Sequence, residues 1–433
     1  MNLKPLAFSL SLYALASAAL AQEPQGLAPV QRAIDGWSAE ETLDNIRNFQ
    51  VSDIVITTER GLWYHGHASQ ISRTAILVRR QPVMELPYAR LPEIGKINAE
   101  TTLGTMSLDA FLTHSESYAQ GFVVVHEGRI VYETYPGMQE LDAHFTASVA
   151  KIFASLAVDQ LIDDGLIDVN ETLGTYVPEF VGSAWEDVTV LDTLDMTVGL
   201  NVSEYDRTTP SSIISRLMAA ELGTPAADGV LEDMVGVMLD AEPFEAYGAP
   251  GDTYTYSSTV TQALVLLVEA VAGQAWSDFF DDRVWSHMGV EGPLQVHLSP
   301  DGLAIVHGPM SMNLRDLARV GMLYTPSWPD ITTMRAVSPA ALARIQGTAR
   351  TEEFYLAGDG PAFRERLGDE TVLTAAHQWD AIWEDGDFFK AGLNTQGLYV
   401  SPDRDLVIAY YSTEPTQMLQ RYLRPIVTSG LFD

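Results

Sequence analysis

The sequence predicts an α/β fold of the α+β type, in which one antiparallel sheet, flanked by helices, is built from both ends of the chain. Three observations lead to this prediction. Paired strand patterns occur at residues 121–135 and again at 397–412, and the region between them, about 188–287, is mostly helical in pattern. We therefore expect a helical domain inserted between the two halves of a single sheet.

Each strand pair contains a turn signal. GFVVVHEGRIVYETY has two apolar runs on either side of Glu127-Gly128, and GLYVSPDRDLVIAYYS places Pro402-Asp403-Arg404-Asp405 between two others. Short apolar, β-branched runs separated by such residues are typical of hairpins. Both pairs are therefore predicted to be antiparallel.

Two segments predict helices by the spacing of their apolar side chains. Residues 146–165, TASVAKIFASLAVDQLIDDG, and residues 259–276, TVTQALVLLVEAVAGQAW, repeat apolar residues at intervals of three and four. Gly273 is expected to end the second helix, because glycine adopts the left-handed conformation that closes helices.

Residues 22–105 form an irregular lead-in, which we expect to pack on a main domain spanning residues 106–433. Short β-branched runs predict strands at Asp53–Thr58 and Thr74–Arg79. His65-Gly66-His67 alternates as two metal ligands on a strand could, but no third ligand is placed nearby. We interpret this stretch as a surface turn and not as a zinc site.

Residues 1–21, MNLKPLAFSLSLYALASAALA, have the pattern of a cleavable secretory signal. One positive charge precedes a short apolar run, and Ala19 and Ala21 precede Gln22, where the mature chain is expected to begin. A membrane anchor is the competing interpretation, but the run is short for a bilayer span and no later stretch qualifies. We therefore expect a periplasmic or secreted protein without an integral membrane span. With no cysteine, its stability must come from a core and not from disulfides.

The chain is strongly acidic and almost free of lysine. Asp and Glu total 58 against 25 Lys and Arg among 433 residues, which gives a net charge of −33. Such a surface repels phosphate groups and anionic headgroups, so nucleic acid and polybasic membrane binding are not expected. The simplest explanation of the acidity is a solvated shell suited to salty water. The four lysines, Lys4, Lys96, Lys151 and Lys390, stand against 21 arginines, so lysine was not selected here for solubility.

Ser148 and Lys151 are spaced i and i+3, which places both side chains on one face of the predicted helix. A desolvated lysine can lose its proton and act as a base toward a serine hydroxyl. The same residues also fit a solvated polar stripe, together with Ser155 and Asp159, on an amphipathic helix. The helix alone leaves both interpretations open.

Several ordered segments together resemble the serine hydrolase family that includes class C β-lactamases, penicillin-binding D-alanyl peptidases, related esterases and 6-aminohexanoate-dimer hydrolases. These segments are FTASVAK at 145–151, VTVLDTLDMTVGL at 188–200, EPFEAYGAPGDTYTYSS at 242–258 and SMNLRDLARVGML at 311–323. The hairpin before Ser148, the segment GLNTQGLYVSP at 392–402 and the long lead-in look most like the 6-aminohexanoate-dimer hydrolase branch. The resemblance covers about residues 30–430 and implies a β-lactamase/transpeptidase-like fold.

The resemblance also implies roles for individual residues. Ser148 is then the nucleophile, Lys151 its base and Tyr256 the phenol that relays protons to the leaving group. The backbone amides of Ser148 and Leu393 are then expected to hold the oxyanion, because acyl transfer needs donors at that oxygen. Gly392, on a strand at the sheet edge, would let the substrate backbone approach closely.

Two positions depart from the family pattern. Ser258 stands where relatives have an asparagine, and its shorter side chain puts β-lactam recognition in doubt. Ala391 replaces a threonine and lacks the hydroxyl that helps to bind a substrate carboxylate. Lys390 beside it could still attract such a carboxylate, or could lie at a strand end with its stem buried. Both interpretations stay open.

The sequence therefore predicts a serine hydrolase that forms an acyl-enzyme on Ser148 and cleaves small esters or linear amides, without metal or other cofactor. A D-alanyl-D-alanine carboxypeptidase or β-lactamase is the alternative enzyme. A non-catalytic binding or scaffold protein on the same fold is a third possibility. The sequence does not specify the acyl group, the leaving group or the oligomeric state.

Overall fold

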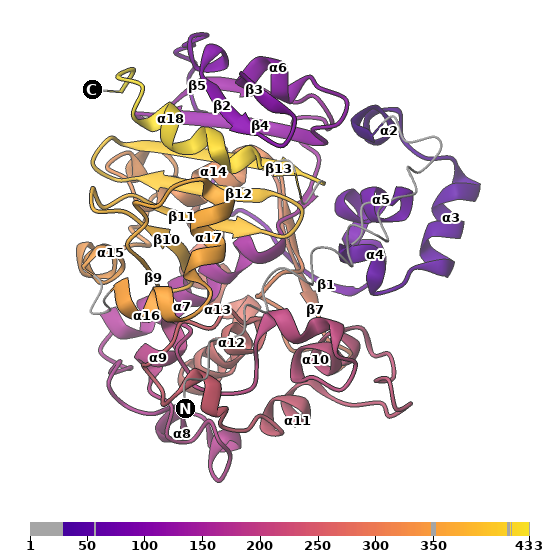
Figure 1. The fold of residues 1–433 in the computed structure, drawn as a ribbon, viewed down its shortest axis with the longest axis vertical. Coiled ribbons are helices and arrows are strands. Elements are labelled where there is room, and N and C mark those ends of the chain that lie inside the picture. Colours follow the sequence, from indigo (N-terminus) through magenta and orange to yellow (C-terminus); the bar gives the residue numbers. More distant parts are fainter. Residues whose placement is uncertain (1–28, 56–57, 348–351, 414–415, 417, 433) are drawn as a thin grey trace, which may run out of the picture.

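The computed structural model describes residues 29–55, 58–347, 352–413, 416 and 418–432 (Figure 1). The predicted signal segment, residues 1–21, lies outside the described residues. Among the described parts, both halves of the chain contribute to one large sheet, and most of the helices lie around it.

The large sheet has seven antiparallel strands in the order β5-β4-β13-β12-β11-β10-β9. The strands are β4 (Ala119–His126), β5 (Arg129–Thr134), β9 (Thr374–Ala376), β10 (Trp379–Ile382), β11 (Phe388–Gly392), β12 (Gln396–Ser401) and β13 (Leu406–Ser412). Val124 of β4 pairs with Ile408 of β13, so strands almost three hundred residues apart are neighbours. This arrangement confirms the predicted sheet built from both ends of the chain.

Both predicted hairpins are present. In the first, Glu127 and Gly128 have φ of 48° and 70°, the positive values that a two-residue turn requires to match the twist of its strands. In the second, Pro402–Asp405 connects β12 to β13, and Asp405 has φ of 48°. The turn residues in the sequence therefore predicted the positions of both hairpin connections.

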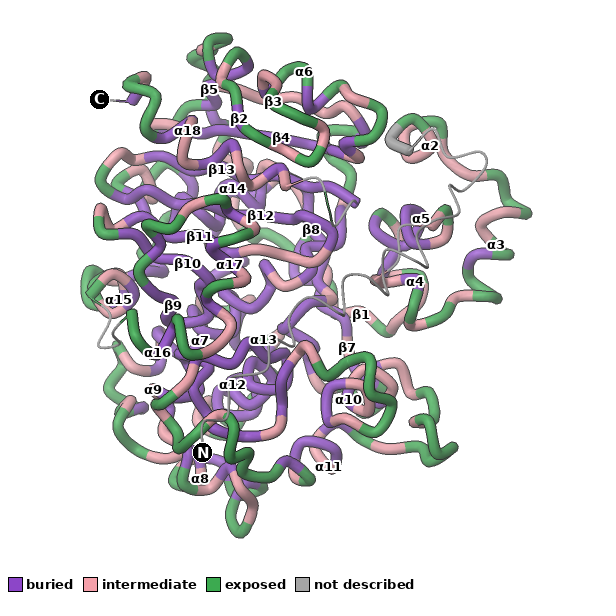
Figure 2. Tube along the Cα trace, viewed as in Figure 1, coloured by how far each residue is buried: buried purple, intermediate pink, exposed green. Residues whose placement is uncertain are grey.

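The region spanning residues 173–287, which includes the residues 188–287 predicted to be mostly helical, is mostly helical. It contains α8 (Leu173–Tyr176), α9 (Val190–Leu194), α10 (Ile213–Leu222), α11 (Met234–Leu239), α12 (Ser258–Ala272) and α13 (Trp276–Arg283). Helix α12 is capped by the Ser257 hydroxyl and ends at Gly273, with φ of 65°. It packs against α7 (Lys151–Asp163), and both helices are buried along most of their length (Figure 2).

The other α-helices precede or follow this region. They are α2 (Pro29–Asp35), α3 (Ala39–Asn48), α4 (Ser52–Val55), α5 (Glu59–His67), α6 (Leu108–Leu112), α14 (Leu314–Met322), α15 (Pro339–Gln346), α16 (Glu352–Ala357), α17 (Gly360–Leu367) and α18 (Leu423–Val427). Short 3₁₀ segments are η1 (Ala68–Gln70), η2 (Ile94–Lys96), η3 (Ala147–Ala150), η4 (Pro178–Phe180), η5 (Glu204–Thr208), η6 (Glu245–Tyr247), η7 (Trp285–His287), η8 (Trp328–Asp330) and η9 (Leu419–Tyr422).

A second antiparallel sheet, which the sequence analysis did not predict, has the order β1-β7-β8-β6. Its strands are β1 (Arg73–Leu77), β7 (Leu294–Leu298), β8 (Met310–Met312) and β6 (His144–Phe145), and β2 (Asn98–Thr101) and β3 (Gly104–Ser107) form a separate hairpin. Strand β1 lies within two residues of the predicted strand Thr74–Arg79. The sheet matters for the site, because β6 ends three residues before Ser148.

Two predictions for the lead-in are wrong. Residues 53–55 of the predicted strand Asp53–Thr58 belong to helix α4 (Ser52–Val55), and His65-Gly66-His67 ends helix α5 instead of forming a surface turn. His65 is only 1% exposed. The imidazoles of His65 and His67 each bond a carbonyl four residues back, those of Gly61 and Trp63. These local bonds fit a helix and not a strand.

The described residues give little support for a bilayer span or a metal site. No single helix there is long and apolar enough to cross a bilayer; α12 together with the segment Trp276–His287 meets the criteria of length and composition only as a pair bent by 74°. Within the same residues, no group of three or more His, Asp or Glu side chains is arranged to hold a metal ion.

Candidate active site

Ser148 lies on a tight turn between β6 and the helical segment η3–α7. Ala147, the residue before it, has φ of 48° and is buried. A non-glycine residue in this left-handed region costs roughly 1–2 kcal/mol, and such a conformation persists only where packing enforces it. The strained turn leaves Ser148 partly exposed at the start of the helical segment, while the residues around it are buried.

Lys151 is completely buried, and its ammonium group contacts three oxygens. Lys151 Nζ lies 3.2 Å from Ser148 Oγ, 2.9 Å from Ser258 Oγ and 2.6 Å from the His307 carbonyl oxygen. A neutral amine keeps two N–H donors and one lone pair. If the His307 carbonyl and Ser258 accept the two N–H groups, the lone pair points to the Ser148 hydroxyl.

Burial favours this neutral form. Desolvation lowers the pKa of Lys151 from 10.5 to about 7. The Glu204 carboxylate acts to raise this pKa, and the charge of Lys390 acts to lower it. The lysine can therefore act as a base near neutral pH.

Tyr256 lies just before α12, and its phenol faces the Ser148 hydroxyl. Its phenol accepts a hydrogen bond from Lys390 Nζ at 3.2 Å and is hydrogen-bonded to the Ser148 side chain. Its backbone amide is fixed by Asp359 Oδ2 at 2.7 Å. Burial raises the pKa of Tyr256 well above 10, and the charges of Asp380 and Glu204 act in the same direction. The phenol therefore keeps its proton and can donate it.

Lys390 lies inside the protein and not at an open strand end. Its Nζ is 2.5 Å from Asp380 Oδ1, and Asp380 Oδ2 accepts the amide of Ala391 at 2.9 Å. Both side chains are essentially unexposed. Burial lowers the pKa of Lys390 and raises the pKa of Asp380, since desolvation disfavours both charges. The ion pair ties β11 to β10 beside the Tyr256 phenol.

Gly392 ends β11 next to the nucleophile turn. A Cβ atom at this position would lie 2.8 Å from the Thr146 carbonyl oxygen and 2.8 Å from Gln396 Cβ. Glycine is therefore required for β11 to approach η3, with which the strand is in contact. Leu393, the next residue, is partly buried against the apolar cluster that includes Ala147. The structure thus brings together all the predicted site residues: Ser148, Lys151, Tyr256, Ser258, Lys390, Gly392 and Leu393.

The sequence analysis missed several side chains around this group. Glu204 Oε2 accepts the Ser258 amide at 2.9 Å; burial acts to raise the pKa of Glu204, but the Lys151 charge and further contacts lower it overall. Glu221 Oε1 lies 2.8 Å from Nε2 of His307, whose carbonyl binds Lys151. Asp380 could have been noticed as an acid inside the apolar run WDAIW. Glu204 and Glu221 carry no such signal among 58 acidic residues.

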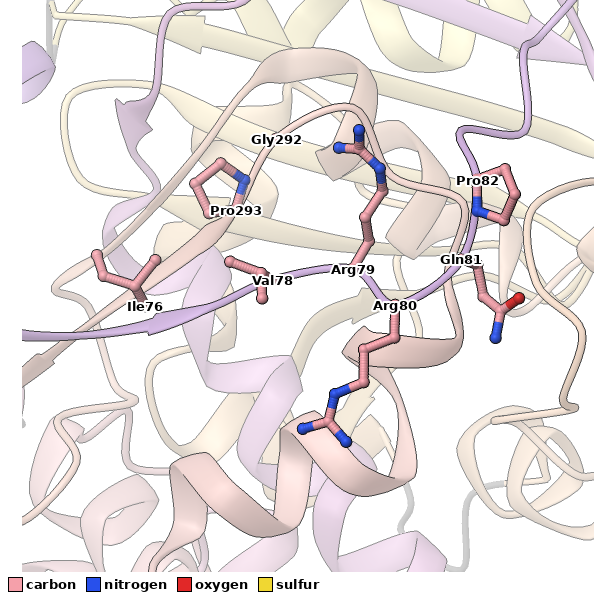
Figure 3. Close-up of a pocket in the computed structure, with 8 residues that line it drawn as sticks. All are labelled: Ile76, Val78, Arg79, Arg80, Gln81, Pro82, Gly292 and Pro293. Carbon is pink, nitrogen blue, oxygen red and sulfur yellow. The ribbon is translucent and has the colours of Figure 1, made fainter.

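Two surface hollows differ in their relation to this site. One, of about 630 Å³, is lined by Ile76, Val78, Arg79, Arg80, Gln81, Pro82, Gly292 and Pro293 (Figure 3) and contains none of the residues above. The other, of about 530 Å³, includes Glu221 together with parts of η1–β1 and α10. Only the second of these hollows borders the residues that surround Lys151.

A Ser-Lys-Tyr group on this fold agrees with the β-lactamase family profile, which matches residues 114–427. The chain belongs to the β-lactamase family. It is a distant homologue of 6-aminohexanoate-dimer hydrolase from Paenarthrobacter ureafaciens, with 26% identity over 362 residues, 82% of this chain and 85% of the relative.

Solved structures show the same fold. A provisionally assigned 6-aminohexanoate-dimer hydrolase from Bacillus anthracis superposes with a TM-score of 0.69 at 20% identity, covering 85% of this β-lactamase-family chain and 92% of its own. The hydrolase EstCE1, described as having promiscuous acyltransferase activity, gives a TM-score of 0.52 at 15% identity and covers 71% and 92%. These results confirm the predicted family and fold class.

Proposed function

We propose that this β-lactamase-family protein hydrolyses small carboxylic esters or linear amides through an acyl-enzyme on Ser148. The observation that carries the proposal is the environment of Lys151, whose two fixed acceptors leave a lone pair for the Ser148 proton. A relative named 6-aminohexanoate-dimer hydrolase and a structural neighbour described as a hydrolase with promiscuous acyltransferase activity support the substrate class. The reaction needs no cofactor in this scheme.

The mechanism has two stages. Ser148 Oγ attacks the substrate carbonyl carbon as its proton passes to Lys151 Nζ, and the amides of Ser148 and Leu393 donate hydrogen bonds to the developing oxyanion. Tyr256 then donates its proton to the departing oxygen or nitrogen, and the proton held by Lys151 restores the phenol. A water molecule, deprotonated by the same groups, attacks the acyl-enzyme and releases a carboxylic acid.

The charges around the site favour uncharged or cationic substrates over anionic ones. Asp380 neutralises Lys390, the nearest candidate for binding a carboxylate, and Ala391 lacks a hydroxyl. Glu204 and Glu221 add negative charge close to Lys151. Penicillins and D-alanyl peptides carry a carboxylate, so we rank the β-lactamase and carboxypeptidase alternatives below esters and amides.

A fluorophosphonate probe tests the nucleophile, because labelling requires an activated hydroxyl beside a base. Peptide mapping should find the label on Ser148, and Ser148→Ala should abolish it. Ser258 is the matched control, since its hydroxyl is also within hydrogen-bonding distance of Lys151 but is buried; in Ser258→Ala any label should still be on Ser148. Labelling of Ser148→Ala at the wild-type level would show that Ser148 is not the nucleophile.

Substrate screening then separates the candidate functions. We expect turnover in a panel of p-nitrophenyl esters and short amides, and little with nitrocefin or labelled penicillin. The reverse pattern would favour the β-lactamase or carboxypeptidase alternative. No labelling and no turnover in either set would favour a binding or scaffold protein. The secretory signal in residues 1–21 makes a periplasmic or secreted location part of the proposal, to be checked by N-terminal sequencing of the mature chain.

A further inference from the structure

The lead-in helices make a small core of their own against the nucleophile turn. Helices α2–α5 gather at one side of the molecule (Figure 1), before the start of the family match at residue 114. The buried residues Trp63 and Tyr64 of α5 and Ala68 of η1 form one cluster with Phe145 and Ala147, which we call the N-terminal cluster. The ring centroids of Tyr64 and Phe145 are 5.3 Å apart.

The N-terminal cluster contacts both turns that carry the proposed oxyanion donors. Ala147, with φ of 48°, precedes Ser148, and Leu393 packs against the cluster from the β11–β12 turn. The two residues after Leu393, Asn394 and Thr395, also have positive φ, 59° and 65°. Strained backbone of this kind persists only where the surroundings hold it.

One side chain of α5 reaches the second turn directly. His65 Nδ1 bonds the Gly61 carbonyl at 2.7 Å, which leaves Nε2 as an acceptor for Asn394 Nδ2 at 3.3 Å. Burial lowers the pKa of His65 to about 4, so the imidazole is neutral and can accept this bond. The same ring lies 5.4 Å from the Phe145 ring, on the chain that enters the nucleophile turn.

We infer that Tyr64 and His65 of α5 are positioning residues for catalysis, which hold the Ser148 and Leu393 amides at the spacing of one oxyanion. Neither side chain touches the reacting atoms. This inference rests on the proposed function, because it assumes that the two amides bind the oxyanion. The lead-in is then a part of the catalytic apparatus.

The test compares two histidines of one helix in the full mature chain. His65→Leu removes the acceptor for Asn394, whereas the bond that His67→Leu removes, to the Trp63 carbonyl, involves no residue of either turn. We expect His65→Leu to lower kcat for an activated ester at least about tenfold with little change in KM, less than the roughly 10²–10³ for loss of a whole donor. Affinity for a phenylboronic acid, whose adduct with serine places an oxygen at the donors, should fall by a similar factor. His67→Leu should stay within about twofold of wild type in both.

Asn394→Gly approaches the same contact from the other side and keeps the positive φ accessible, so it covers the case in which His65→Leu does not fold. Its loss and that of His65→Leu should be less than additive in the double variant. Equal losses in His65→Leu and His67→Leu, or losses that follow the unfolded fraction in thermal melts, would overturn the inference. If Ser148→Ala itself keeps activity, the proposed function fails instead, and the two failures are therefore distinguishable.

Discussion

The pH dependence of activity follows directly from the burial of Lys151. With a pKa of about 7, the neutral fraction is about one half at pH 7, about 10% at pH 6 and about 1% at pH 5. At the ordinary lysine pKa of 10.5 the neutral fraction at pH 7 would be about 3 in 10,000. The lowering of the pKa from 10.5 to about 7 corresponds to roughly 5 kcal/mol in favour of the neutral form. Because kcat/KM reports the free enzyme, it should be level above pH 8 and fall about tenfold for each unit below pH 7.

The assay uses a neutral p-nitrophenyl ester, so that the substrate does not titrate, and reads product where phenol and phenolate absorb equally. Glu204→Gln is a control for which the direction of the shift in the Lys151 pKa can be predicted. The Glu204 carboxylate acts to raise the pKa of Lys151, so removing its charge should move the acid limb to lower pH. A profile that is flat between pH 5 and 8, or an inflection that survives in Lys151→Ala, would refute the assignment of Lys151 as the base.

Three further outcomes are expected. Lys151→Arg keeps the charge but cannot deprotonate in working conditions, so its kcat should fall nearly as far as that of Lys151→Ala. If the arginine variant keeps more than about a tenth of wild-type kcat, the barrier has changed by less than about 1.4 kcal/mol. Lys151 would then contribute only electrostatically and would not be the base. Tyr256→Phe should cut amide turnover about 100-fold or more but ester turnover distinctly less, because p-nitrophenolate leaves without a proton; equal losses in acyl-matched substrates would assign the phenol to the nucleophile instead. Gly392→Ala places a Cβ 2.8 Å from the Thr146 carbonyl, and since neither backbone can yield without moving the nucleophile turn, we expect at least a tenfold loss of kcat/KM; near wild-type activity would show that the turn is not tightly held.

The sequence was sufficient for the elements whose local signals agree with their tertiary surroundings. The turn at Glu127-Gly128 and the end of the helix at Gly273 both require positive φ values, which glycine adopts readily, so the glycines at both places predicted these features. Ser148, Lys151 and Tyr256 were selected as candidate site residues because several ordered segments resemble one family. Their convergence around one oxygen is a property of the packed chain, and no spacing in the sequence expresses it.

The failures have identifiable physical causes. Residues 53–58 are β-branched in part and read as a strand, but the Asp53 carboxylate accepts the Gln50 amide and starts a short helix instead. His65 read as exposed because histidine is polar, yet a bond to its own helix and an amide partner satisfy it in the interior. Glu204 and Glu221 were hidden among a large excess of acids expected on the surface. Whether one acidic side chain among many is buried depends on the partners that it meets in the folded protein, and these partners are not adjacent to it in the sequence.

The distribution of lysines has a practical consequence for handling this protein. Lys151 and Lys390 are wholly buried, Lys4 precedes the expected mature start, and among the described residues Lys96 in η2 is the one lysine with an exposed side chain. Reagents that couple to amines should therefore attach to the mature protein at Lys96 and at the terminal amino group. Lys96 lies outside the candidate site. Amine coupling would thus immobilise the protein in a nearly uniform orientation, whereas amine-to-amine cross-linkers would have few sites from which to report neighbours.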